Sequence, residues 1–192
     1  MKPKKTLFQR VLDLGSRSVV EDIQSAGSDT VVSPEYRRQL IAMADRLDGM
    51  FFLNTGADAA KLTVGLIIAR AMEMDEVLIH SRSLGPAYYK DVLRGLKCPA
   101  RILLDDPAGV SVIERLPRDI QDRINVRVLP LIKAGGVIIH CVATDYSFRC
   151  GLVEQDDELS GWASFNHPPK AQSWREHFEK LWEKALPFSI VP

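Results

Sequence analysis

The segment from residue 135 to residue 166 constrains the fold of this 192-residue chain more than any other part of the sequence. Val137–Ala143 and Phe148–Val153 are two β-rich runs separated by a short polar turn, and Trp162–Phe165 is a third such run. Two strands joined by so short a turn must pair antiparallel. We therefore predict a β-hairpin followed by one more strand, the last of the chain.

Upstream of this hairpin, β-rich runs alternate with helical patterns. The predicted strands are 76–81, 100–104 and 125–129, and the predicted helices are 58–72, 87–96, 111–116 and 171–185. In the terminal helix, Trp174, Phe178, Leu181 and Trp182 recur at the spacing of one helical face. Strands that first alternate with helices and then follow one another predict an α/β fold with a mixed β-sheet flanked by helices.

The first 50 residues differ from this pattern. Ser33-Pro34-Glu35 is a typical helix start, because serine caps the helix and proline is favoured at its first position. The predicted helix runs to about Leu47 and ends at Asp48-Gly49. We therefore expect an N-terminal helical extension over 1–50 and an α/β domain over 51–192.

The composition excludes several classes of protein. Lys+Arg and Asp+Glu each number 25, so the global charge favours neither nucleic acid nor a membrane surface as a partner. No apolar run approaches the roughly 18 residues that a membrane-spanning helix needs, and the basic start lacks the apolar core of a signal peptide. We expect a cytoplasmic protein without a membrane partner.

The three cysteines, Cys98, Cys141 and Cys150, are too few and too widely spaced for a disulfide scaffold. The sequence contains no Cys-x-x-Cys spacing, so we expect no metal site. It also gives no reason to expect a cofactor.

Three features after residue 135 share a pattern with a known family. His140 stands near the end of the first hairpin strand, Ser164 and Asn166 follow on the third strand, and Phe178 and Trp182 are four residues apart in the terminal helix. This order resembles one repeat of the phospholipase D superfamily over about residues 58–186. The family motif is His-x-Lys, four residues, then Asp. Here Val142 stands at the lysine position and Ser147 at the aspartate position, so the motif is degenerate.

The resemblance implies a specific chemistry. In the family, one histidine attacks phosphorus and a second histidine, from another repeat, protonates the leaving group. Two lysines hold the oxygens on which charge develops. The resemblance therefore makes His140 the candidate catalytic residue. Because the sequence shows one repeat, it also implies a homodimer that pairs two such sites.

Arg149 is the candidate to replace the missing lysine. If Asp145-Tyr146 forms a two-residue turn, Val142 pairs with Arg149 and Cys141 with Cys150. His140 and Arg149 then share one face of the sheet, where the guanidinium can bind phosphate. A one-residue slip in the register moves Arg149 to the other face.

Other residues are weaker candidates for binding. Ser164 and Asn166 either bind ligand or cap the turn at Asn166-His167-Pro168. His80 and Arg82 lie at the carboxyl end of a predicted strand and either border the same cleft or belong to a solvated loop. The basic start offers three residues for contact with nucleic-acid phosphates, Lys2, Lys4 and Lys5.

These observations favour a non-catalytic binding or regulatory protein on a degenerate phospholipase D-like domain. Such a protein would hold a phosphate-containing ligand or nucleic acid. One alternative is a phosphodiesterase or nuclease with His140 as nucleophile and Arg149 in place of the lysine. The other is a structural subunit of a larger complex.

Overall fold

The computed structural model describes residues 32–54, 56–130, 138–153 and 159–188. The described helices are α3 (Pro34–Asp45), α4 (Ala57–Arg70), α5 (Pro86–Leu93), η1 (Pro107–Val110), α6 (Ser111–Glu114), α7 (Arg118–Gln121) and α8 (Pro168–Trp182). The described strands are β1 (Phe52–Asn54), β2 (Val77–Ser81), β3 (Ala100–Leu104), β4 (Ile124–Val128), β5 (Ile138–Ala143), β6 (Phe148–Val153), β7 (Leu159–Ser164) and β8 (Leu186–Pro187).

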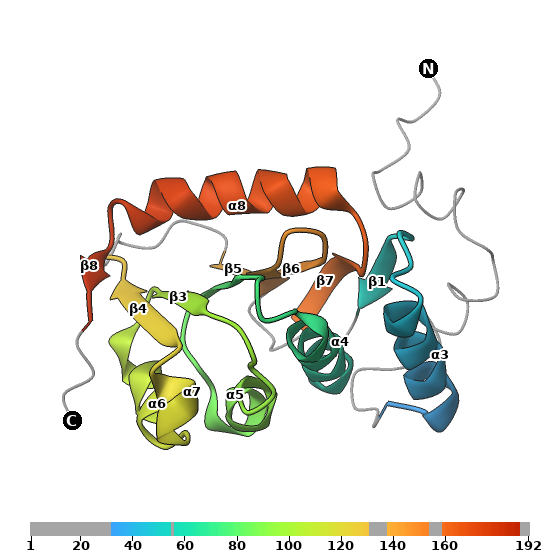
Figure 1. The fold of residues 1–192 in the computed structure, drawn as a ribbon, viewed down its shortest axis with the longest axis horizontal. Coiled ribbons are helices and arrows are strands. Elements are labelled where there is room, and N and C mark those ends of the chain that lie inside the picture. Colours follow the sequence, from blue (N-terminus) through green and yellow to red (C-terminus); the bar gives the residue numbers. More distant parts are fainter. Residues whose placement is uncertain (1–31, 55, 131–137, 154–158, 189–192) are drawn as a thin grey trace.

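The eight described strands form one sheet in the order β1-β7-β6-β5-β2-β3-β4-β8. β2, β3 and β4 pair parallel, and every other neighbouring pair is antiparallel. The sheet lies between two helical layers, with α8 on one face and α3 to α7 on the other (Figure 1). The predicted mixed sheet flanked by helices is therefore confirmed.

The hairpin of β5 and β6 has the register that the sequence predicts. Val142 lies opposite Arg149, and Cys141 lies opposite Cys150. Thr144 holds the turn, because its Oγ1 accepts from Ser147 N at 3.0 Å and its own N donates to Ser147 O at 2.9 Å. The short polar turn thus fixes which face of the sheet each later side chain occupies.

Successive residues of the central strands enter two separate cores, because side chains alternate between the faces of a sheet. Ile79 and Ile102 pack under α4, α5 and α6, whereas Leu78 and Leu103 pack under α8. Both faces of β2 are therefore buried, and its first three residues, Val77–Ile79, are apolar, as expected of a strand covered on both sides.

The described part of the predicted extension packs onto the domain. Ser33 Oγ caps α3 by accepting from Tyr36 N at 3.1 Å. Leu40 and Ala44 are each 1% exposed and belong to the same buried cluster as α4. Residues 1–31 of the predicted extension lie outside the described residues.

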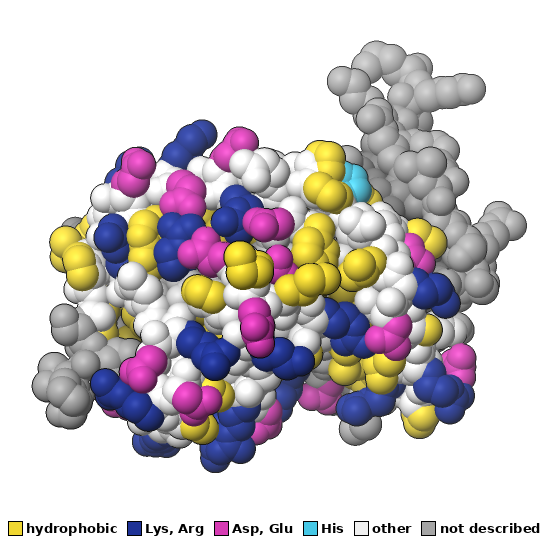
Figure 2. Space-filling view, viewed as in Figure 1, with side chains coloured by type: hydrophobic (Ala, Val, Ile, Leu, Met, Phe, Trp, Pro, Cys, Tyr) yellow, Lys and Arg dark blue, Asp and Glu magenta, His cyan; other side chains and the backbone are white. Residues whose placement is uncertain are grey.

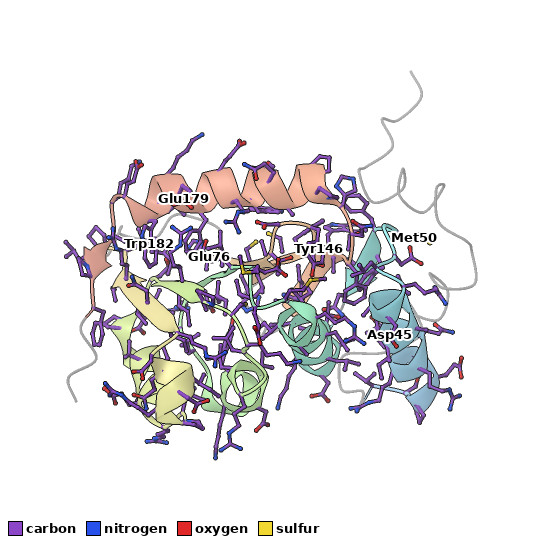
Figure 3. All side chains as sticks on the ribbon, in the orientation of Figure 1. Asp45, Met50, Glu76, Tyr146, Glu179 and Trp182 are labelled. Carbon is purple, nitrogen blue, oxygen red and sulfur yellow. The ribbon has the colours of Figure 1, made fainter. Side chains whose placement is uncertain are left out.

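The terminal helix α8 binds the sheet through its apolar face and through one arginine. Phe178 and Trp182 are buried and stack on each other with ring centroids 5.4 Å apart. Arg101 on β3 donates to Glu76 and to Glu179 over 2.6–2.8 Å. Figure 3 shows Glu179 and Trp182 on α8 above the strands, with Glu76 beneath them. The predicted amphipathic helix is confirmed, although it begins at Pro168 rather than at residue 171.

The predicted short helix 111–116 is confirmed as α6, which lies between a 3-10 turn and a second short helix, α7, that the sequence did not predict. One local prediction was wrong. The strand near Trp162 is not the last one, because Leu186–Pro187 pairs with the edge of β4. Within the described residues, no helix combines the length and the apolar character that a membrane crossing requires.

Candidate functional site

His140 and Arg149 meet on the face of the sheet that α4 and α5 cover. An Arg149 guanidinium nitrogen lies 3.0 Å from His140 Nδ1. The two residues are diagonal neighbours on β5 and β6, since Arg149 pairs with Val142 and His140 pairs with Gly151. Arg149 is 0% exposed and His140 is 5% exposed, so this contact lies inside the protein.

Asn54 at the end of β1 holds the other side of the guanidinium. Its Oδ1 accepts from Arg149 Nε at 2.8 Å, and its Nδ2 donates to Thr63 Oγ1 on α4 at 3.0 Å. Nδ2 also lies 3.4 Å from the hydroxyl of Tyr36 on α3. Asn54 and Thr63 are both 0% exposed. A buried amide needs such partners, because an unpaired polar group away from water is costly.

The second ring nitrogen of His140 also has a partner, because His140 Nε2 is hydrogen-bonded to the hydroxyl of Tyr89 on α5. Arginine has only donors, so Nδ1 of His140 must accept from Arg149. In a neutral imidazole the proton then resides on Nε2, which donates to the Tyr89 oxygen. Together these residues form a polar chain that links α3, β1, α4, β6, β5 and α5: Tyr36, Asn54, Thr63, Arg149, His140 and Tyr89. Tyr36 is partly buried and the other five are buried, and we call this set the buried polar chain.

The surroundings of His140 keep its ring neutral. Burial is the main cause that lowers the pKa of His140 to about 3, and the neighbouring charges of Arg149 and His80 act in the same direction. Burial likewise raises the pKa of Tyr36 at the other end of the polar chain. His140 and Tyr36 are therefore both neutral, and the guanidinium of Arg149 is the permanent charge in the buried polar chain.

This arrangement has a chemical consequence for His140. A nucleophilic imidazole must direct an unprotonated nitrogen at its substrate. In the structure the Nδ1 lone pair faces Arg149, and Nε2 faces Tyr89. The chain of polar groups fixes both the tautomer and the orientation of the ring.

His80 and Ser164 lie on the opposite face of the sheet from His140. Residues paired across neighbouring strands lie on the same face of a sheet. His80 pairs with Cys141, which faces α8. Ser164 pairs with Phe148, which in turn pairs with Ala143, and Ala143 also faces α8. His80 Nε2 lies 3.1 Å from Asp105 Oδ1. Ser164 is 0% exposed, and its Oγ accepts from Asn166 N at 3.4 Å. The structure therefore does not bring these two candidates to His140.

Arg82 and Asn166 are exposed and lie at opposite ends of the sheet. Arg82 directly follows β2, and Asn166 lies two residues after the end of β7. The pairings β2–β5, β5–β6 and β6–β7 are all antiparallel, so β2 and β7 run in opposite directions. Of these two ends, the one that carries Arg82 is nearer His140. His80, two residues before Arg82, pairs with Cys141, which is the next residue after His140. The predicted nucleic-acid contacts Lys2, Lys4 and Lys5 lie outside the described residues.

Four residues of the buried polar chain were not predicted from the sequence: Asn54, Thr63, Tyr36 and Tyr89. The tyrosines sit in helices, where an aromatic residue indicates only a core position. Asn54 could have been recognised, because it directly follows the apolar run Met50–Leu53. An amide at the end of a buried run needs a hydrogen-bond partner inside the protein. No cluster of three or more His, Cys, Asp or Glu suited to a metal ion occurs in the described part of the chain.

Comparison with solved structures identifies the fold. Nuc, a phospholipase D family member from Salmonella typhimurium, matches with a TM-score of 0.50 and 13% sequence identity over 72% of this chain and 97% of that one. TrmBL2, described as an archaeal chromatin protein with a novel mode of DNA binding, matches with a TM-score of 0.51 and 12% identity. That match covers 98% of this chain and 72% of TrmBL2.

No family model and no curated protein sequence matches the chain. At 12–13% identity, the likeness to the two solved structures is one of fold. The chain thus has a phospholipase D-like fold, as the order of its strands and helices predicts.

Proposed function

We propose that this protein is a non-catalytic nucleic-acid-binding protein built on a degenerate phospholipase D-like domain. The observation that carries the proposal is the state of His140, whose two ring nitrogens are both hydrogen-bonded to protein side chains. A residue held in this way organises the interior of the sheet rather than attacking a substrate.

The position of the missing lysine supports the absence of catalysis. Phosphoryl transfer needs cations at the oxygens where charge develops in the transition state. Val142 stands at that position, is apolar and is 0% exposed. Arg149, opposite it, directs its guanidinium at His140 and Asn54. Both features favour a structural role for His140 and Arg149.

The choice of nucleic acid as partner rests on the fold neighbour and on the basic start of the chain. TrmBL2, which shares this fold, is described as a DNA-binding chromatin protein. Basic and acidic side chains are interspersed on the face shown in Figure 2, so that face presents no extended patch of one sign. We assign the phosphate contacts to Lys2, Lys4 and Lys5, because they form the basic start of the chain. These lysines contact phosphates without reading base edges, so binding has little sequence preference.

We further propose that the protein acts as a homodimer in the cytoplasm. One phospholipase D-like repeat carries one copy of each site residue, and a two-fold axis is the simplest way to present two basic arms to one duplex. Two arms bind one nucleic acid more tightly than one arm, because the second contact becomes intramolecular.

A titration at several salt concentrations tests the binding. Fluorescence anisotropy of a labelled random-sequence duplex should show binding at low salt that weakens linearly on a logarithmic plot as salt rises. Replacement of Lys2, Lys4 and Lys5 by glutamine should weaken binding and flatten the salt dependence. Replacement of three exposed basic residues elsewhere, Arg37, Lys90 and Arg94, is the matched control and should change binding less. Equal effects of the two triple variants would refute the role of the arm.

A phosphodiesterase is the second candidate, favoured by one observation. Arg149 lies within 3.0 Å of His140, so a cation does stand beside the histidine. Hydrolysis of bis(p-nitrophenyl) phosphate by the wild-type protein, lost in His140→Ala, would establish this activity in place of our proposal. If the protein neither binds nucleic acid nor hydrolyses the ester, a role as a structural subunit of a larger complex becomes the better account.

A further inference from the structure

Two of the three cysteines lie directly opposite each other on neighbouring strands. Cys141 on β5 pairs with Cys150 on β6, on the α8 face of the sheet. His140 and Arg149 precede them in sequence and occupy the other face. Cys98, the third cysteine, lies in the loop before β3 and is 1% exposed.

The hydrogen-bond pattern of the hairpin determines the geometry of this pair. Thr144 N donates to Ser147 O, so these two residues form a hydrogen-bonded pair. Hydrogen-bonded and non-hydrogen-bonded pairs alternate along an antiparallel ladder, which makes Cys141 and Cys150 a non-hydrogen-bonded pair. The Cα atoms of such a pair are roughly 4.5 Å apart. This separation falls within the range of about 4.4–6.8 Å that a disulfide spans.

The surroundings of the pair give a small oxidant access to it. Cys150 is half-buried, whereas Cys141 is 7% exposed. Cys141 lines a cavity of about 10 Å³ together with His80, Trp174 and His177. The Trp174 Nε1–H is buried there without a hydrogen-bond partner among the described residues. Leu78, Ala143 and Phe178 complete the lining of this cavity, which is mainly apolar. Access of a small oxidant to the pair therefore depends on the exposed part of Cys150.

We propose that Cys141 and Cys150 form a reversible cross-strand disulfide when the protein meets hydrogen peroxide. The Cys150 thiolate attacks one peroxide oxygen, the O–O bond breaks, and Cys150 becomes a sulfenic acid while hydroxide leaves. The Cys141 sulfur then attacks the Cys150 sulfur, the S–OH bond breaks, and the thiol proton leaves with the hydroxyl group as water. The proton first lost by Cys150 converts the earlier hydroxide to water. In sum, two thiols and one peroxide give one disulfide and two waters.

The order of these steps follows from exposure. Burial raises the pKa of the Cys141 thiol well above its usual value, and its contact with Cys150 raises it further. Cys141 therefore stays protonated, and the more exposed Cys150 meets the oxidant first. The bond joins the two strands that carry His140 and Arg149, so oxidation fixes their register. This inference depends on the hairpin and is independent of nucleic-acid binding.

Peptide mapping of the native full-length protein tests the proposal directly. Trypsin cleaves after Arg149 and so separates Cys141, in peptide 134–149, from Cys150, in peptide 150–170. After peroxide treatment and blocking of remaining thiols, a digest without reductant should contain these two peptides joined by one disulfide. Dithiothreitol should release them, and Cys98 should carry the blocking group. Intact mass should show the loss of two hydrogen atoms per chain.

Two variants sharpen the test. Cys150→Ser should abolish the linked peptides and the loss of two hydrogen atoms, whereas Cys98→Ser should retain both. Survival of all three thiols in the treated wild-type protein would overturn the proposal. So would a disulfide that involves Cys98, a bond only between chains, or conversion of Cys141 or Cys150 to sulfinic acid without a disulfide.

Discussion

Asn54→Ala tests whether the buried polar chain stabilises the fold. The side chain of Asn54 holds Arg149 on one side and Thr63 on the other, at 2.8 Å and 3.0 Å. Alanine removes both contacts and leaves no room for bulk water, because Asn54, Thr63 and Arg149 are all 0% exposed. The substitution therefore removes an acceptor from a buried cation rather than from a solvated one.

The expected loss follows from the two hydrogen bonds. A hydrogen bond to a charged group contributes about 1.5–3 kcal/mol, and a neutral one about 1 kcal/mol. We therefore expect Asn54→Ala to lower the free energy of unfolding by about 3 kcal/mol. For a chain of this size, such a loss lowers Tm by roughly 6–12 °C.

Urea denaturation followed by the intrinsic fluorescence of the tryptophans measures this change. Asn125→Ala is the matched control, because Asn125 is an exposed asparagine on the strand β4. An exposed substitution of this kind changes stability by about 0.5 kcal/mol or less. If Asn54→Ala is as stable as Asn125→Ala, the chain from Asn54 to His140 contributes nothing to stability, and our account of the site is refuted.

Three further predictions concern other parts of the molecule. Folding lowers the pKa of His140 from about 6.5 to about 3. The neutral ring therefore makes its full contribution to the free energy of unfolding above pH 6.5, and this contribution declines as the pH falls toward 3. The decline is about 1.4 kcal/mol for each pH unit, and urea melts of His140→Gln, which does not titrate, should show a flatter dependence between pH 6.5 and 4.5. Trp182→Ala should cost about 3–5 kcal/mol, because the ring is 7% exposed and packs on Phe178; an unchanged Tm would show that α8 is peripheral to stability. Light scattering at micromolar concentration should give twice the 21.5 kDa mass of one chain, and a monomer mass would count against the homodimer.

The sequence was sufficient to predict the local parts of the fold. The Asp145-Tyr146 turn defines the register of β5 and β6, because a two-residue loop leaves one pairing between the strands. The mixed sheet follows equally from the order of the β-rich and helical runs. The 3-10 turn η1 before α6 and the short helix α7 after it were not predicted, because such short elements depend on packing more than on an apolar period.

The candidate site was only half visible in the sequence. His140 and Arg149 are nine residues apart, and hairpin geometry joins them. Tyr89 is 51 residues from His140, and Asn54 is 95 residues from Arg149, so only the tertiary fold brings these partners in. For Ser164 the sequence left open either a ligand contact or a turn cap. The register of β6 and β7 turns this residue toward α8, where its Oγ accepts from Asn166 N.

One experiment tests the central claim most directly, namely that the protein binds nucleic acid without cleaving it. An end-labelled duplex is incubated with the full-length protein at low salt in the presence of a chelator. Bound duplex is then separated from free duplex, and the length of the recovered strands is read on a denaturing gel. We predict that the duplex is retained by the protein and that its strands are recovered at full length. No retention at the lowest salt, or strand cleavage that disappears in His140→Ala, would contradict the account.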